Sequence, residues 1–269
     1  MAKVESPWGE TRLEVGDCRY WQIGPLGFWV RRAELEWQIA ETRCDEVGLA
    51  VAATEPEPPE DAAWIRWASG EVNPPVRVRP VTPDRPIVVL PAQPFRILKG
   101  GKARIYISIP VWVRVELAVE NDPLLLTDMA TVRMSNTWFG TLFEGSLCYW
   151  TETSARRNST DYPPRPHVAV APMFIHNRVQ EELPLEKVCL RTAHLALYGG
   201  KTGLWTSEVR VTNTGPGAPE RIEVSEGAPE EAGDAELIAE PRERPRGGVL
   251  ARTFDLISSL PGLEGGLAG

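Results

Sequence analysis

The stretch Arg104–Val119 reads RIYISIPVWVRVELAV and contains the strongest periodic pattern in this 269-residue chain. Every odd position from Ile105 to Val119 is apolar, whereas arginine, serine and glutamate occupy several of the even positions. This period of two predicts one long strand, or two collinear strands, with one buried face. Because Pro110 has no N–H to donate, we expect the strand to lie at a sheet edge or to bend there.

Other segments carry weaker strand patterns. Phe28–Ala40 and Leu204–Thr212 alternate apolar and polar residues, and His167–Ile175 is apolar on both faces, as in a central strand. Shorter candidates are Thr11–Val15, Arg19–Ile23, Gly48–Ala52, Val76–Arg79, Pro86–Leu90, Thr131–Met134, Ser146–Thr151 and Leu185–Leu190. Helical periodicity is confined to Leu250–Leu260. We therefore expect an all-β fold with two β-sandwich-like domains of mostly antiparallel strands, followed by a short C-terminal helix.

The expected domain boundary lies in Ser154–Pro166, which has no apolar period and contains three Pro residues and one Asp. The prediction is an N-terminal β domain over residues 1–153, a boundary loop over 154–165 and a C-terminal β-sandwich domain over 166–240. A linker, the short helix and a frayed tail make up residues 241–269. The helix either packs on its own domain or docks in a partner's groove.

Composition excludes several classes of protein. The chain is 42% hydrophobic and 25% charged, as in ordinary globular proteins, with a net charge of -8, 10 Trp, and 24 Arg against 5 Lys. The net charge argues against general nucleic-acid binding. There is no apolar run of 18 residues and no signal-peptide pattern at the start, so we expect no membrane span and a cytoplasmic location.

Few residues suggest reaction chemistry. The four cysteines form no CxxC pair and are expected to be mostly buried, with Cys18–Cys44 and Cys148–Cys189 bridges left open. His167 and His176 are nine residues apart and would face opposite sides of a regular strand, which disfavours a shared metal site. We therefore predict no catalytic residue, metal ligand or cofactor. Whether the chain is an enzyme stays open, and the sequence favours a protein that is not one.

Two loops have a binding alternative. Lys99–Lys102 (KGGK) is expected to be a Gly-Gly hairpin turn, although its lysines and Arg104 would form a small basic rim for an anionic partner. Asn136–Thr141 (NTWFGT) is expected to be a loop that carries two large aromatic side chains beside a glycine. Such a loop either contacts a partner or plugs the end of a sandwich.

Seven strings, in order, resemble the largely archaeal family known as domain of unknown function 432. They are Pro86–Pro94 (PIVVLPAQP), Arg104–Val115 (RIYISIPVWVRV), Thr137–Tyr149 (TWFGTLFEGSLCY), Ala171–Asn177 (APMFIHN), Leu195–Tyr198 (LALY), Leu204–Val211 (LWTSEVRV) and Glu240–Arg244 (EPRER). The resemblance implies soluble proteins, some of them companions of small mechanosensitive channels, with no established activity, cofactor or catalytic residue. An archaeal, thermophilic origin would suit the preference for arginine.

The function expected from these observations is a non-enzymatic binding or interaction module for a protein partner, with a membrane channel as one option. The residues in the resembling strings that we expect to contribute to binding are Trp138, Phe139, Gly140, His176, Asn177, Trp205 and Arg242. One alternative is a hydrolase or sugar-acting enzyme with a site between the domains, using Asp128, Glu144 and Asp161 as acid and base. The other is a self-assembling structural subunit, and the oligomeric state stays open.

Overall fold

A computed structural model describes residues 6–44, 57–69, 73–91, 95–120, 122–140, 145–159, 164–215, 221–244 and 249–250. The protein is all-β, and its described residues contain no α-helix. Its strands are β1 (Gly9–Thr11), β2 (Cys18–Ile23), β3 (Leu26–Arg32), β4 (Glu36–Arg43), β5 (Ile65–Ala68), β6 (Val76–Val81), β7 (Ile87–Pro91), β8 (Phe95–Ile97), β9 (Lys102–Pro110), β10 (Trp112–Leu117), β11 (Leu124–Ala130), β12 (Ser135–Gly140), β13 (Gly145–Arg156), β14 (Val168–Asn177), β15 (Leu183–Leu185), β16 (Val188–Leu190), β17 (Leu197–Gly200), β18 (Gly203–Thr206), β19 (Val209–Asn213), β20 (Arg221–Val224), β21 (Glu236–Ala239) and β22 (Val249–Leu250). Two short 3-10 turns, Thr192–His194 and Glu230–Ala232, are also present.

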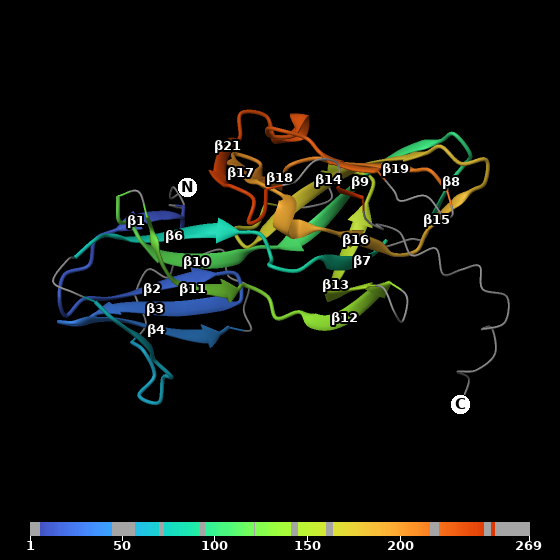
Figure 1. Ribbon diagram of the computed structural model, residues 1–269. Coiled ribbons are helices and arrows are strands. Elements are labelled where there is room, and N and C mark those ends of the chain that lie inside the picture. Colours follow the sequence, from blue (N-terminus) through green and yellow to red (C-terminus); the bar gives the residue numbers. More distant parts are fainter. Residues whose placement is uncertain are drawn as a thin grey trace, which may run out of the picture.

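One end of the molecule is formed by two four-stranded sheets, β1-β6-β10-β11 and β2-β3-β4-β5 (Figure 1). All of their pairings are antiparallel. Both sheets contribute side chains to one hydrophobic cluster, which includes Phe28 and Trp37 from one sheet and Val78 and Val113 from the other. The two sheets therefore pack face to face, because each has one apolar face to bury. We call this cluster the first core.

The other end contains a mixed sheet of twelve strands with the main order β16-β7-β13-β9-β14-β18-β17-β21 (Figure 1). β7 runs parallel to β13, and β14 runs parallel to β18 and β19, whereas β9 and β14 are antiparallel. A second hydrophobic cluster contains side chains from both halves of the sheet. It includes Ile87 on β7 and Val188 on β16, and also Val209 on β19 and Ile222 on β20. One curled sheet thus supplies much of this second core.

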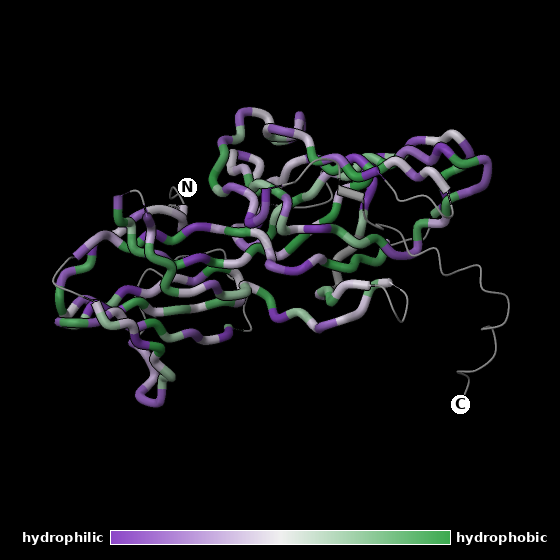
Figure 2. The backbone as a smooth tube through the Cα atoms, viewed as in Figure 1, coloured by the Kyte–Doolittle hydropathy of each residue, from purple (hydrophilic) through white to green (hydrophobic). Residues whose placement is uncertain are grey.

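The long periodic stretch connects the two cores as two collinear strands, one of the two predicted arrangements. β9 ends at Pro110, and β10 starts at Trp112 after the single residue Val111. The buried odd positions of β9 join the second core, and those of β10 join the first. Both strands have neighbours on each side, so Pro110 marks a break rather than a sheet edge. Figure 2 shows the resulting mixture of hydrophobic and hydrophilic positions along the strands.

The expected strand Phe28–Ala40 is wrong, because the chain reverses within it. β3 and β4 form an antiparallel hairpin in which Arg32 pairs with Trp37, and Leu35 at the turn is 63% exposed. Arg32 is itself buried, and its Nη1 donates to the carbonyl oxygens of Ala33, at 2.6 Å, and Glu36, at 3.2 Å. The alternation of side chains continues across the turn, so periodicity alone does not reveal it.

Several other expectations change in detail. Leu204–Thr212 is interrupted between β18 and β19, and Leu185–Leu190 contains the last residue of β15 and all of β16. Thr131–Met134 and most of Thr11–Val15 are not strands. Lys99–Lys102 contains a turn, with Gly100 at φ +65°, but it does not connect a hairpin because β8 pairs with β15. Gly48–Ala52 and all but the first residue of Leu250–Leu260, including the expected helix, lie outside the described residues.

Strand pairing crosses the expected boundary at residues 154–165. β9 precedes this segment and β14 follows it, yet the two pair over nine residue pairs from Val168↔Pro110 to His176↔Lys102. β13 also extends to Arg156, inside the expected loop. The pairing gives no support to a division at this point, and the domain limits stay a prediction that expression of the separate parts would test.

Candidate functional site

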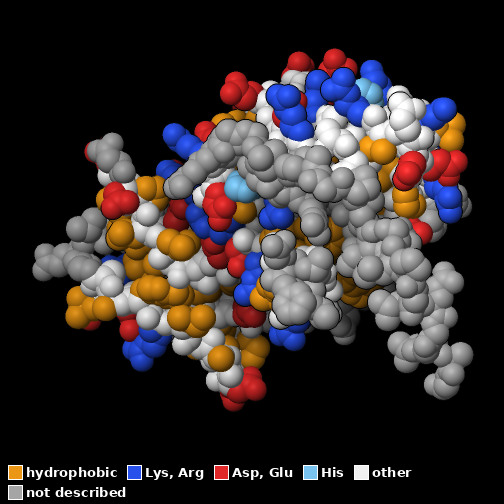
Figure 3. All heavy atoms as spheres, turned by 45° about the vertical axis from the view of Figure 1, so that its right-hand side comes forward, with side chains coloured by type: hydrophobic (Ala, Val, Ile, Leu, Met, Phe, Trp, Pro, Cys, Tyr) orange, Lys and Arg blue, Asp and Glu red, His pale blue; other side chains and the backbone are white. Residues whose placement is uncertain are grey.

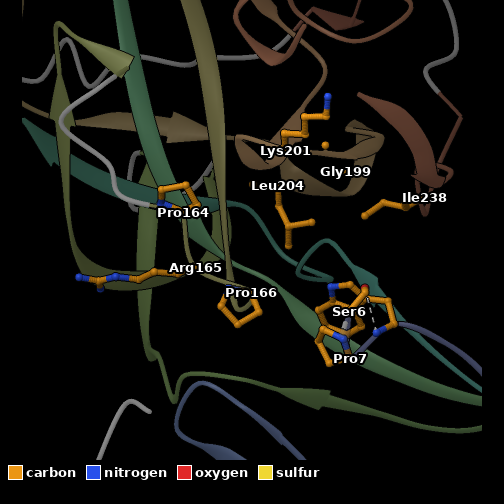
Figure 4. Close-up of a pocket in the computed structure, with 12 residues that line it drawn as sticks. Ser6, Pro7, Pro164, Arg165, Pro166, Gly199, Lys201, Leu204 and Ile238 are labelled. Carbon is orange, nitrogen blue, oxygen red and sulfur yellow. Dashed lines mark hydrogen bonds between the residues drawn. The ribbon is translucent and has the colours of Figure 1, made fainter. Parts of the chain in front are cut away.

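A pocket of about 500 Å³ lies where the N-terminal segment, Pro164–Pro166, the β17–β18 hairpin and β21 meet. We call it the inter-core pocket, because Trp8 in its wall packs against both large cores. Its volume is within the ordinary range for small-ligand sites. Figure 4 shows Leu204 and Ile238 pointing towards the same space as Pro166 and Pro7. The interior of the pocket is therefore mainly apolar.

Glycines allow the walls of the pocket to approach closely. Gly203 has φ +103°, a conformation that side-chain-bearing residues rarely adopt, and a Cβ there would lie 3.2 Å from a Pro164 side-chain carbon. A Cβ on Gly199 would lie 3.3 Å from two Ile238 carbons. The β17–β18 hairpin pairs Gly199 with Leu204 and Gly200 with Gly203. The sequence YGGKTGLW thus forms a tight hairpin that presents Leu204 to the pocket.

The charge of the pocket wall differs from that of the whole chain. The protein has 37 Asp and Glu residues and a net charge of -8, yet the described residues that line the pocket include Arg165 and Lys201 and no carboxylate. Figure 4 shows both cationic side chains extending away from the apolar centre. The arrangement therefore combines an apolar interior with a cationic rim.

Trp138, Phe139 and Gly140 lie on a strand rather than in the loop that we expected. β12 pairs with β13 from Ser135↔Trp150 to Gly140↔Gly145. Because side chains alternate across a strand, Trp138 is 53% exposed whereas Phe139 is buried beside Val88. The Trp138 ring lies over Gly145, where a Cβ would come within 2.6 Å of it.

His176 and Asn177 end β14, and their side chains differ in surroundings. Asn177 is fully buried, and its Nδ2 donates to the carbonyl oxygens of Ile97, Leu98 and Glu181 at 2.8–3.2 Å. Its Oδ1 accepts from the Val179 N–H and from Asn213 Nδ2, both at 3.2 Å. Asn177 therefore connects the end of β8, the β14–β15 loop and the end of β19, whereas the partly exposed His176 is cross-strand from Lys102.

Trp205 and Arg242 also lie apart from one another. Trp205 is buried against Tyr106 and Tyr198, and its Nε1 donates to Thr202 Oγ1 at 3.0 Å. Arg242 bonds the Thr82 carbonyl oxygen through Nε, and its guanidinium carbon is 5.5 Å from the Trp112 ring centroid. The expected binding residues thus belong to several separate clusters, and none of them lines the inter-core pocket.

The carboxylate expected to serve an enzyme, Asp128, is held between two arginines. Arg114 donates to both of its oxygens at 2.6–2.7 Å, and Arg242 Nη1 donates to Oδ2 at 2.6 Å. These charge-assisted hydrogen bonds lower the pKa of Asp128, although burial acts in the opposite direction. An ionised carboxylate in such a fork is suited to an ion pair. Glu144 and Asp161 lie outside the described residues.

The cysteines are free thiols. Cys148 and Cys189 are buried on β13 and β16 with their sulfurs 4.0 Å apart, while Cys18 and Cys44 are partly exposed. The hydrogen bond from Cys189 lowers the pKa of Cys148, with burial opposing it and the positive charge of Arg191 assisting it. Within the described part of the chain, no three His, Cys, Asp or Glu residues are grouped as a metal site would require.

The chain belongs to the family described as "Protein of unknown function (DUF432)", whose model matches residues 7–258. This match confirms the resemblance and extends it well before Pro86, where the recognised strings began. Neither the curated proteins nor the solved structures contain a match. A search of the described residues finds no helix with the length and apolarity that crossing a membrane requires.

Sequence reasoning missed the inter-core pocket. Its residues come from four separate regions of the chain, residues 6–8, 164–166, 199–204 and 238. The one local signal was the repeated glycine in Gly199–Gly203, which indicated a tight turn next to a strand. Nothing in the local sequence indicates that prolines from a distant segment meet this turn.

Proposed function

We propose that this protein is a non-enzymatic binding module that accepts an apolar side chain from a protein partner in the inter-core pocket. The observation that carries the proposal is the combination of an apolar interior, lined by Trp8 and Leu204, with a rim whose described residues include Arg165 and Lys201 but no carboxylate. A partner segment with one large apolar residue flanked by Asp or Glu would match both properties.

At about 500 Å³, the pocket is large enough for an apolar anchoring side chain together with part of the segment that carries it. Burial of one Leu or Phe side chain contributes roughly 1.5–3 kcal/mol, which alone gives weak binding. Contacts of the flanking acidic residues with Arg165 and Lys201 would add specificity and faster association. A segment of a small channel protein, exposed in the cytoplasm, is one partner that fits the proposal. The cytoplasmic location is itself part of the proposal.

Panning of a displayed library of random twelve-residue peptides tests this function. We expect enriched peptides to share one large apolar residue with acidic neighbours. They should also displace the fluorescent apolar anion 8-anilinonaphthalene-1-sulfonate from the protein. The variant Ile238→Glu should weaken peptide binding at least tenfold, because it places a carboxylate in the apolar wall.

Leu237→Glu is the matched control, because Leu237 precedes Ile238 on β21, is 48% exposed and does not line the pocket. It should change peptide affinity less than twofold. The proposal fails if enriched peptides lack an apolar anchor, or if they bind the Ile238→Glu protein as tightly as the unchanged one. Thermal unfolding of both variants checks that each is folded.

A separate observation favours self-assembly as a second function. The β10–β11 hairpin exposes Val119, Leu124 and Leu125 at 37%, 53% and 52%, and β11 is the last strand of its sheet. Figure 3 shows hydrophobic side chains exposed over the left-hand end of the molecule, which the two four-stranded sheets form. Exposed apolar residues beside an edge strand favour pairing between copies. Light scattering that gives the monomer mass at every concentration would exclude this function.

A further inference from the structure

The outer face of the twelve-stranded sheet carries a row of four polar side chains on four strands, with a lysine at one end and an arginine at the other. Lys102 on β9 is cross-strand from His176 on β14, which is cross-strand from Thr212 on β19, which is cross-strand from Arg221 on β20. We call these four residues the cationic row, after Lys102 and Arg221 at its two ends. Their neighbours in sequence, Val211 and Ile222 among them, face the second core, so the row faces away from it.

The next row on the same face shows how this surface binds carboxylates within the chain. Arg104 bonds Glu208, and it contacts Glu231 at 3.1 Å. Tyr106 donates its hydroxyl to Glu231 at 2.6 Å, and Arg210 donates to Glu208 at 2.7 Å. Glu231 belongs to an acidic 3-10 turn, Glu230–Ala232, which lies over the sheet. One acidic segment therefore already docks on this face.

The cationic row continues this surface beyond the acidic turn. Lys102 is exposed and has no carboxylate within ion-pair distance among the described residues, and the same holds for the exposed Lys99 and Arg178 at the ends of β9 and β14. Three acidic side chains of this face are already paired, because Glu223 binds Arg221 at 2.7 Å and Glu208 and Glu231 bind Arg104. Figure 3 shows Lys and Arg side chains gathered along the upper side of the molecule, with Asp and Glu among them.

We propose that the cationic row, with Lys99 and Arg178, is a docking surface for an acidic peptide segment of a partner protein. Adjacent strands are about 4.8 Å apart, so the row is roughly 14 Å long and spans four or five extended residues. The occupant follows from charge complementarity and from the acidic segment that the chain itself places on the neighbouring row. A net charge of -8 disfavours nucleic acid, whose charge density is far higher.

This surface is distinct from the inter-core pocket. Leu204 and Ile238 of the pocket lie on the side of the sheet that faces the second core, and the cationic row lies on the other side. The two surfaces share no residue. Failure of one proposal therefore leaves the other intact.

Fluorescence anisotropy with a labelled peptide of ten residues, alternating Glu and Ser, tests the surface. We expect saturable binding at about 25 mM salt that weakens steeply at about 150 mM, because exposed charges are screened within a Debye length. The double variant Lys102→Glu with Arg178→Glu should weaken binding at least tenfold. The control Lys187→Glu reverses an exposed lysine between β15 and β16 and should change affinity less than twofold.

Three results would overturn the proposal. The first is no saturable binding of the peptide at low salt. The second is equal weakening by Lys187→Glu, which would show that net charge alone is responsible. The third is binding of a ten-nucleotide oligothymidylate as tight as that of the peptide, which would make the surface a general polyanion site. Matching urea midpoints of all variants exclude loss of fold as the cause.

Discussion

Arg242 connects the C-terminal part of the described chain to the sheets of the first core. It lies beyond β21, and it contacts Asp128 on β11, the Thr82 carbonyl oxygen after β6 and the Trp112 ring on β10. The side chains of Arg242 and Asp128 are 15% and 16% exposed, so solvent screens their interaction only in part. We predict that Arg242→Ala destabilises the protein by about 3 kcal/mol.

The magnitude follows from the interactions that are lost. A hydrogen bond to a charged group contributes about 1.5–3 kcal/mol, and a partly buried cation–π contact contributes about 0.5–1 kcal/mol. Asp128 keeps its two-point contact with Arg114 in the variant, so it is not left as an unpaired buried charge. The expected loss of about 3 kcal/mol therefore lies at the lower limit of the roughly 3–5 kcal/mol that is lost when a buried pair is fully broken.

Equilibrium unfolding in urea, which does not screen charges, gives the free energy. Because the protein has two large cores, tryptophan fluorescence and circular dichroism must give coincident transitions before a single free energy is assigned. The control is Arg96→Ala, since Arg96 and Glu182 are 70% and 49% exposed and form an ion pair at 3.1 Å. We expect about 0–0.5 kcal/mol for this exposed pair.

A double-mutant cycle isolates the contact itself. Combining Arg242→Ala with Asp128→Asn should give a coupling energy of about 1–2 kcal/mol, because the two side chains share a hydrogen bond. Arg242→Lys should recover only part of the stability, since an ammonium lacks the planar fork that reaches Asp128 and Thr82 together. A coupling energy near zero, or a loss in Arg242→Ala no larger than in Arg96→Ala, would refute this reasoning.

Three further predictions concern buried groups. His167 is buried, and burial together with Arg165 lowers its pKa to about 4, from 6.5. The native state disfavours protonation of His167. The contribution of its neutral side chain to the free energy of unfolding is therefore complete above about pH 6.5, and it decreases by roughly 3 kcal/mol as the pH falls to about 4. Urea titrations from pH 4 to 7 should therefore give a difference in free energy of unfolding between the unchanged protein and His167→Gln that changes with pH. A difference that stays constant would contradict the lowered pKa of His167. Gly24→Ala should be strongly destabilising, because Gly24 has φ +60° and an added Cβ would lie 2.4 Å from the His167 ring; an unchanged thermal midpoint would show that the contact is not formed. Asn177→Ala should lower the free energy of unfolding by about 3–5 kcal/mol, because it leaves several buried partners unsatisfied, and urea unfolding with Asn213→Ala as the milder control measures it.

Strand identity was predictable where one side of a strand is buried. Ile105, Ile107 and Val113 alternate with polar or mixed positions, and period-two burial requires no knowledge of the partner strand. The apolar run that becomes β14 was also predictable, because a strand covered on both sides needs apolar residues on both. These patterns depend only on the residues of the strand itself, so the sequence is sufficient to predict them.

Chain reversals without a turn signal were not predictable. The β3–β4 turn contains neither Gly, Pro, Asn nor Asp, and Arg32 supports it with help from Ser69, whose hydroxyl accepts from Arg32 Nη1 at 2.8 Å. The opposite error occurred at Trp138 and Gly140. A glycine next to aromatic residues suggested a loop, yet pairing with β13 makes the segment a strand. In both cases a distant segment decides the local structure.

The amino-acid sequence alone determined that the protein is built of strands, and it identified the family and the long stretch that links the two cores. The tertiary structure alone decided which strands pair, and so which residues meet. Alternation specifies which side of a strand is buried, but it does not specify the partner strand, because many pairings bury the same side. The inter-core pocket, the cationic row and the contact between Arg242 and Asp128 all depend on such pairings. Each joins residues from distant parts of the chain, so only the folded protein brings them together.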